Sequence, residues 1–146
     1  MLKGIPAIIS PELLKVLDEM GHGDTILLAD GNYPSESMGK NSIVIRGDGH
    51  GACEYLEAIL KLFPLDTYVE KPVTIMKKVP GDTVETPIWD EFKKIVSKED
   101  SRGESVFSEV ERFEFYERSK KAYAIIATGE LALYGNVMLQ KGVVVE

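Results

Sequence analysis

The sequence is poor in the residues that bind metals or cross-link a chain. Cys53 is the only cysteine among 146 residues, and His22 and His50 are the only histidines. A single cysteine excludes an internal disulfide, and so few cysteines and histidines disfavour an ordinary zinc site. We therefore expect no metal and no cross-link, and this cysteine content is typical of a reducing compartment.

Positive charge and long apolar runs are also scarce. The chain has 17 Lys and Arg residues against 24 Asp and Glu, which gives a net charge of -7. Nucleic acids and anionic membranes attract positive surfaces, so both are disfavoured as partners. No run approaches the roughly 18 apolar residues of a membrane span, and no signal-peptide core is visible. These observations predict a cytoplasmic location.

The rest of the composition is that of an ordinary globular protein. Hydrophobic residues make up 44% of the chain and charged residues 28%, which is enough apolar material for one core. The length suits one domain. We therefore expect residues 1–146 to form a single domain.

Apolar runs and helix signals alternate along the chain. Strands are expected at 25–29, 43–45, 73–76, 123–127 and 136–140. Helices are expected after Ser10–Pro11, after Gly51, after Thr86–Pro87 and over 113–121. Some runs are continuously apolar, as in strands buried on both faces. The alternation is typical of an α/β layered domain with a largely parallel sheet.

Two helix boundaries can be predicted in more detail. Ser10 can cap the first helix and Pro11 fits its first position. Gly21 is placed to end that helix in a left-handed conformation. The polar stretch 98–104 contains Gly103, and we interpret it as a loop.

His22 is the first candidate for chemistry. It lies between Gly21 and Gly23, just before a buried strand. Glycines let the backbone bend and leave the imidazole open, and an imidazole titrates near neutral pH, as a proton-transfer group should. Taken alone, the pattern also fits a loop histidine that only caps the helix.

Asp30 is the second candidate. It directly follows the buried run 25–29, and open α/β sheets bind ligands at the carboxyl ends of their strands. Its carboxylate can accept hydrogen bonds from ligand hydroxyls, or it can close a turn on its own backbone.

Two C-terminal segments add polar and aromatic groups. Helical spacing puts Arg112 and Tyr116 on one side, either as a pocket wall or as part of an amphipathic helix surface. Tyr134, Gly135 and Asn136 precede the last strand and form either a turn or part of a site. The residues alone thus indicate a polar site built from His22, Asp30 and these segments.

The glycine-rich stretch 47–51 has a different interpretation. It lacks the lysine and the spacing of a phosphate-binding loop. We therefore interpret it as a helix-capping turn, with His50 solvated in the first helical turn.

Several segments, taken together, resemble one known family. They lie at residues 1–3, 9–15, 19–24, 29–30, 112–118, 128–130 and 134–136. Because they follow one another in the family's order over nearly the whole chain, the chain is identified as a member of the ribose pyranase/fucose mutarotase family. Gly23 after His22, with the segments 115–118 and 134–136, is more similar to the fucose branch.

The resemblance implies a fold, an activity and an assembly. The fold is a three-layer α/β/α domain. The activity is mutarotation, an isomerase reaction in which a sugar ring opens and recloses, without metal or cofactor. Bacterial members form ring-shaped decamers in which neighbouring subunits complete each site. The implied partners are a monosaccharide and further copies of the chain.

The resemblance also implies roles for single residues. His22 is similar to the acid/base residue, while Asp30, Arg112 and the segment Tyr134–Gly135–Asn136 are similar to the sugar-binding positions. Ring opening needs one proton delivered to the ring oxygen and another removed from the anomeric hydroxyl. Tyr134 is the candidate for the second proton-transfer group.

Three functional hypotheses follow. The first is interconversion of the α and β anomers of L-fucose. The second, within the same family, is pyranose–furanose interconversion of D-ribose. The third is a non-catalytic sugar-binding or transport accessory protein, which is less supported because a pure binder does not need a titratable histidine between glycines.

Overall fold

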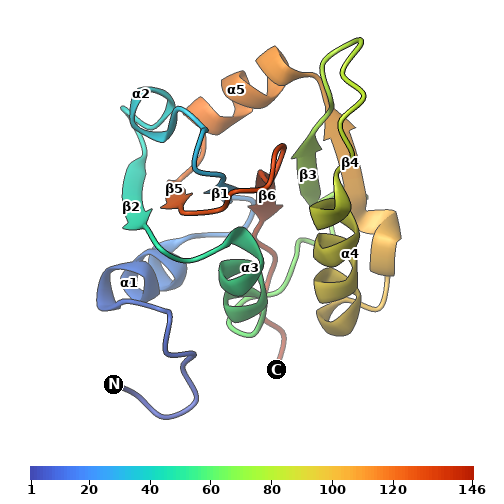
Figure 1. The fold of residues 1–146 in the computed structure, drawn as a ribbon. Helices are drawn as coiled ribbons and strands as arrows, with labels where there is room; N and C mark the ends of the chain where they lie inside the picture. The colour runs from blue at the N-terminus through green and yellow to red at the C-terminus, as the bar shows by residue number, and fades with distance from the viewer.

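Six strands form one sheet that is covered by helices on both sides (Figure 1). A computed structural model describes all residues, 1–146. The elements in chain order are α1 Pro11–Glu19, β1 Thr25–Ala29, α2 Ser35–Met38, β2 Ile43–Gly47, α3 Ala52–Leu60, β3 Val73–Met76, α4 Pro87–Glu99, a 3-10 helix Gly103–Val106, β4 Phe107–Val110, α5 Arg112–Lys120, β5 Ala124–Thr128 and β6 Val137–Gln140. None of the helices is long and apolar enough to cross a membrane.

The sheet has the strand order β2-β5-β1-β6-β3-β4. Strand β6 is antiparallel to β1 and β3, whereas all other neighbours pair in parallel. The prediction of a largely parallel mixed sheet is therefore confirmed. The carboxyl ends of five strands meet at one edge, and β6 starts from that same edge, so the loops that follow β1, β3 and β5 lie close together.

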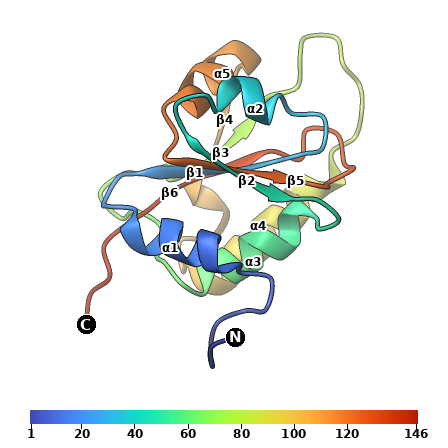
Figure 2. The same cartoon turned by 90° about the vertical axis from the view of Figure 1, so that its left-hand side faces the viewer.

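The helices divide into two layers. Helices α1, α3 and α4 cover one face, and α2 and α5 cover the other (Figure 2). Strand β1 shows how each face is filled, since Ile26 and Leu28 belong to the larger core cluster while Leu27 and Ala29 belong to the smaller one. Successive side chains of a strand point to opposite faces, so a continuously apolar run is buried on both sides. The three-layer α/β/α prediction is confirmed.

The first helix begins as predicted but ends differently. The Ser10 hydroxyl accepts a hydrogen bond from the Leu13 N–H at 3.1 Å. At the other end, Met20 turns the chain out of the helix with φ -61° and ψ 130°. Gly21 does not adopt the predicted left-handed conformation. It enters a tight turn in which its N–H donates to the Asp24 carboxylate at 2.7 Å. The left-handed glycine is instead Gly23, with φ 88°.

Three short elements were not predicted. Helix α4 runs to Glu99 and the 3-10 helix begins at Gly103, so the prediction of a loop over 98–104 was wrong at both ends. Strand β4 and helix α2 have four residues each. Strand β4 pairs only with β3 at the sheet edge and is partly exposed, so its sequence carries little of the apolar pattern that identifies a buried strand.

Candidate functional site

A pocket of about 290 Å³ lies at the carboxyl edge of the sheet. It lies between the loops after β1, β3 and β5 and the start of α5, and this volume is near the lower end of the range for small-molecule sites. The structure brings together here four predicted site residues: Asp30, Arg112, Tyr134 and Asn136. Met76, Val79 and Leu133 supply apolar wall, so the pocket combines hydrogen-bonding groups with apolar contacts.

Asp30 and Asn136 form the floor of this pocket as a mutually bonded pair. The Asp30 N–H donates to Asn136 Oδ1 at 2.8 Å, and Asn136 Nδ2 donates to Asp30 Oδ2 at 3.0 Å. Both side chains are buried. Burial raises the pKa of Asp30 above its ordinary value, and hydrogen bonds from the Asn32, Gly135 and Tyr33 N–H groups and from Asn136 oppose that rise only in part.

Gly135 belongs to the same floor. A Cβ at this position would lie 2.9 Å from the Ala132 carbonyl oxygen, 2.9 Å from Cγ of Glu130 and 3.5 Å from the Asp30 Cβ. A side chain would therefore push the 129–136 loop away from Asp30. The predicted Tyr134–Gly135–Asn136 segment is a turn that also lines the pocket.

Tyr134 is held in a strained conformation on the pocket wall. Its φ of 57° is in the left-handed region, which costs about 1–2 kcal/mol for a residue other than glycine. The Trp89 indole donates to its carbonyl oxygen at 2.9 Å, and its hydroxyl donates to Asp82 at 2.6 Å. The hydrogen bond to Asp82 raises the pKa of Tyr134 above its ordinary value, so the phenol keeps its proton at neutral pH.

Arg112 reaches the pocket from the first turn of α5. Its Nε donates to the Tyr116 hydroxyl at 3.1 Å, one helical turn away. The guanidinium also lies 5.3 Å from the centre of the Tyr116 ring. Helical spacing had predicted that Arg112 and Tyr116 lie on one side of the helix. The remaining N–H groups of the Arg112 guanidinium can bind oxygen atoms of a ligand.

His22 is not in this pocket. It lies in the turn before β1, whereas Asp30 follows the other end of β1, and a strand of five residues is about 16 Å long. A single chain therefore does not bring His22 and Asp30 into one site. His22 Nε2 instead lies 3.0 Å from Asp66 Oδ1.

Two of the remaining predicted features have structural roles. His50 is exposed, but the prediction that it lies in the first helical turn was wrong, because α3 begins two residues later, at Ala52. Its Nδ1 lies 2.9 Å from the Glu54 carboxylate. Glu130, from the family-like segment 128–130, accepts hydrogen bonds from the Ala52 and Ala132 N–H groups. It thereby ties the loop after β5 to the start of α3.

Sequence reasoning missed Asp82 and Tyr33 as members of the pocket. Asp82 lies in the long loop between β3 and α4, which extends beyond the sheet (Figures 1 and 2), and nothing in its local sequence indicates that Tyr134 binds it. Tyr33 lies three residues after Asp30, and burial raises its pKa to about 12. No group of three or more His, Cys, Asp or Glu side chains is placed to hold a metal ion.

Comparisons with known proteins match nearly the whole chain. The model of the RbsD / FucU transport protein family matches residues 3–144. The fucose mutarotase of Homo sapiens is 52% identical over 146 residues, covering 97% of this chain and 94% of that protein.

Two crystal structures are similar in sequence and in fold. FucU from Bifidobacterium longum is 62% identical, with a TM-score of 0.97 over 98% of this chain and 100% of that one. The fucose mutarotase from Streptococcus pneumoniae in complex with L-fucose is 49% identical, with a TM-score of 0.91 over 99% of this chain and 100% of that one.

Proposed function

Because the chain belongs to the RbsD / FucU transport protein family, we propose that it is an L-fucose mutarotase. It interconverts the α and β anomers of L-fucose as a single domain over residues 1–146, in the cytoplasm. The observation that carries this proposal is the full-length similarity to a fucose mutarotase crystallised with L-fucose. The polar pocket at the carboxyl edge of the sheet supports it, since its size and lining suit a monosaccharide.

The pocket residues divide into binding and proton-transfer groups. The Asp30 carboxylate accepts hydrogen bonds from sugar hydroxyls, and Arg112 and Asn136 donate to sugar oxygens. Gly135 lets its loop approach Asp30 closely. Apolar surface for the 6-deoxy methyl group comes from Met76, Val79 and Leu133. Burying one such group in an apolar pocket contributes about 1–3 kcal/mol of binding free energy.

Proton transfer needs a group that one chain does not bring to the pocket. His22 lies at the opposite edge of the sheet from Asp30, so we propose that a neighbouring subunit supplies it. Catalysis would then require the expected decameric ring, because no single subunit has a complete site. Leu133 in the pocket lining and Leu131 two residues earlier are both exposed, which is consistent with a surface covered by a neighbouring subunit.

The reaction uses two proton transfers in each direction. His22 takes the proton of the anomeric hydroxyl. The Tyr134 hydroxyl turns away from Asp82 and gives its proton to the ring oxygen, and the C1–O5 bond breaks to leave the free aldehyde. After rotation about C1–C2, the ring oxygen attacks the other face of the aldehyde. Tyr134 recovers its proton from that oxygen, and His22 returns the proton that it took to the aldehyde oxygen, which becomes the new anomeric hydroxyl.

Saturation-transfer NMR tests this proposal against its alternatives. We expect catalysed exchange between the α and β anomers of L-fucose, with a smaller effect on D-ribose, and an unchanged rate after dialysis against EDTA because only protons move. Faster exchange with ribose alone would favour the pyranase reaction. Sugar binding without any increase in rate would favour a non-catalytic accessory protein.

We expect the affinity for L-fucose to decrease as the pH is lowered, because the Asp30 carboxylate becomes protonated. Its pKa is raised by burial, so the carboxylate takes up a proton at higher pH than an ordinary aspartate, whose pKa is about 3.9. Below the raised pKa, the apparent Kd should increase about tenfold per pH unit. Titration calorimetry between pH 7 and pH 4 measures this. The dependence should persist in His22→Gln and disappear in Asp30→Asn, and a flat profile in the unmodified protein would contradict it.

A further inference from the structure

His22 is held through one of its two ring nitrogens. Nε2 lies 3.0 Å from Asp66 Oδ1, and the ring of Tyr68 packs against the imidazole with centroids 5.0 Å apart. The imidazole side chain is 44% exposed, whereas that of Asp66 is only 2% exposed. One edge of the imidazole therefore faces a buried carboxylate while the rest of the ring remains accessible.

The Asp66 carboxylate is fixed by further hydrogen bonds. Oδ1 accepts from the Tyr68 N–H at 2.9 Å, and Oδ2 accepts from Gln140 Nε2 at 2.9 Å. Burial alone would raise the pKa of Asp66, but the hydrogen bonds from Tyr68, His22 and Gln140 outweigh it and lower the pKa below its ordinary value. Asp66 is therefore ionised at neutral pH and acts only as an acceptor toward the imidazole.

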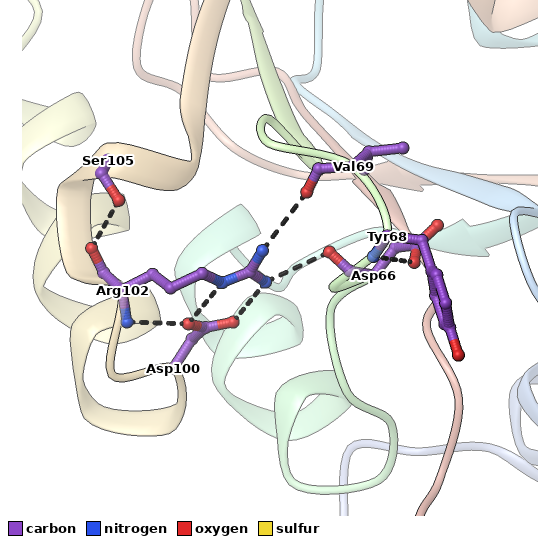
Figure 3. A network of polar contacts seen from close by, with 6 residues as sticks. All are labelled: Asp66, Tyr68, Val69, Asp100, Arg102 and Ser105. Atoms are coloured by element: carbon purple, nitrogen blue, oxygen red, sulfur yellow. Dashed lines mark hydrogen bonds and ion pairs between the residues drawn. The ribbon is translucent and has the colours of Figure 1, made fainter.

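Arg102 holds the segment that carries Asp66 (Figure 3). Its guanidinium donates to the main-chain carbonyl oxygens of Asp66 at 3.2 Å and Val69 at 3.3 Å. Asp100 fixes that guanidinium through two side-chain hydrogen bonds of 3.0 and 2.8 Å. These contacts tie the 66–69 segment to the end of α4, and a planar guanidinium is suited to such divergent contacts as a lysine is not.

We propose that Asp66 and Arg102 are positioning residues for His22, with Arg102 fixing the 66–69 segment and Asp66 fixing the imidazole. A neutral imidazole has one N–H donor and one acceptor nitrogen. The carboxylate requires the donor at Nε2, which leaves the lone pair on Nδ1. The proposal rests on the acid/base role proposed for His22, and it assigns the proton transfer with the sugar to Nδ1.

The tautomer of His22 can be read directly from the assembled protein. With 15N-histidine labelling, solid-state NMR shows only two rings, and His50→Gln identifies the signal of His22. We expect neutral His22 to be protonated at Nε2, and the tautomer with the proton on Nδ1 would overturn the proposal. This measurement needs no change at Asp66 and no activity.

Asp66→Asn then tests whether the charge of the carboxylate matters for the reaction. The Tyr68 N–H keeps an oxygen next to Nε2, so the amide still accepts from the imidazole but cannot stabilise its protonated form by charge. We expect the Nε2–H tautomer to persist and the maximal exchange rate to fall about tenfold or more, with little change in KM for fucose. An unchanged rate would overturn the proposal.

Arg102→Gln tests the outer contact, with Arg46→Gln as its matched control. Arg46 also binds an aspartate two residues away, Asp48, but lies on β2. We expect Arg102→Gln to lower the rate about tenfold or more and Arg46→Gln to leave it unchanged. Equal exchange rates in Arg102→Gln and Arg46→Gln would overturn the positioning role of Arg102.

If His22→Gln retained full activity, the proposed function of His22 would fail, while the tautomer spectra would still decide whether Asp66 orients the ring.

Discussion

Replacing His22 by glutamine is expected to lower the catalysed rate of L-fucose anomer exchange about 10²–10⁴-fold. Glutamine keeps the length and a polar end, but it has no group that takes up and releases a proton near neutral pH. Its amide can still contact Asp66, so the turn before β1 should keep its structure. Saturation-transfer NMR measures the rate, and calorimetry should show that fucose still binds.

His50→Gln is the matched control for this prediction, because His50 is the only other histidine. It is exposed just before α3 and pairs with Glu54 on that helix. We expect its exchange rate to equal that of the unmodified protein. Equal rates in the two variants would remove His22 from the reaction and leave binding by the pocket as the established role of the site.

Co-expressing two inactive variants is expected to restore activity. His22→Gln removes the acid/base group and Asp30→Asn removes the sugar-binding carboxylate, so each alone should have little activity. If His22 of one subunit completes the pocket of another, random mixing gives about a quarter of the sites both native residues. The rate per site should therefore rise from near the background to about a quarter of the native value.

The control for this experiment co-expresses His22→Gln with His22→Ala. No mixed site in that assembly contains the histidine, so no activity should return. Native mass spectrometry shows whether mixed assemblies have formed and gives the number of subunits. Mixed assemblies of His22→Gln and Asp30→Asn without recovered activity would contradict a site shared between subunits.

Local sequence patterns predicted most of the helices and strands. The Ser10–Pro11 start of α1 was correct because the cap and the first helical position depend on neighbouring residues alone. Strand β1 was correct because burial on both faces leaves a continuously apolar run. Strand β4 was missed because its pairing with β3 at the sheet edge depends on residues more than 30 positions away.

In the candidate site too, contacts between residues distant in the chain could not be predicted from local sequence patterns. Asp30 and Asn136 are 106 residues apart, and their hydrogen bonds exist because β1 and β6 are neighbours in the sheet. Asp82 lines the pocket and accepts a hydrogen bond from the hydroxyl of Tyr134. The position of Asp30 after a buried run was visible in the sequence, but the partners of Asp30 and Asp82 were not, because those partners lie far away in the chain.

His22 shows most clearly what each level decided. The sequence by itself determined that a titratable side chain lies between two glycines just before a buried strand, because these are properties of adjacent residues. Only the tertiary structure decided that β1 separates it from Asp30 and that Asp66 lies against its Nε2. The physical reason is that strand pairing and helix packing bring together residues distant in the chain, and they hold apart others that the sequence places within eight positions.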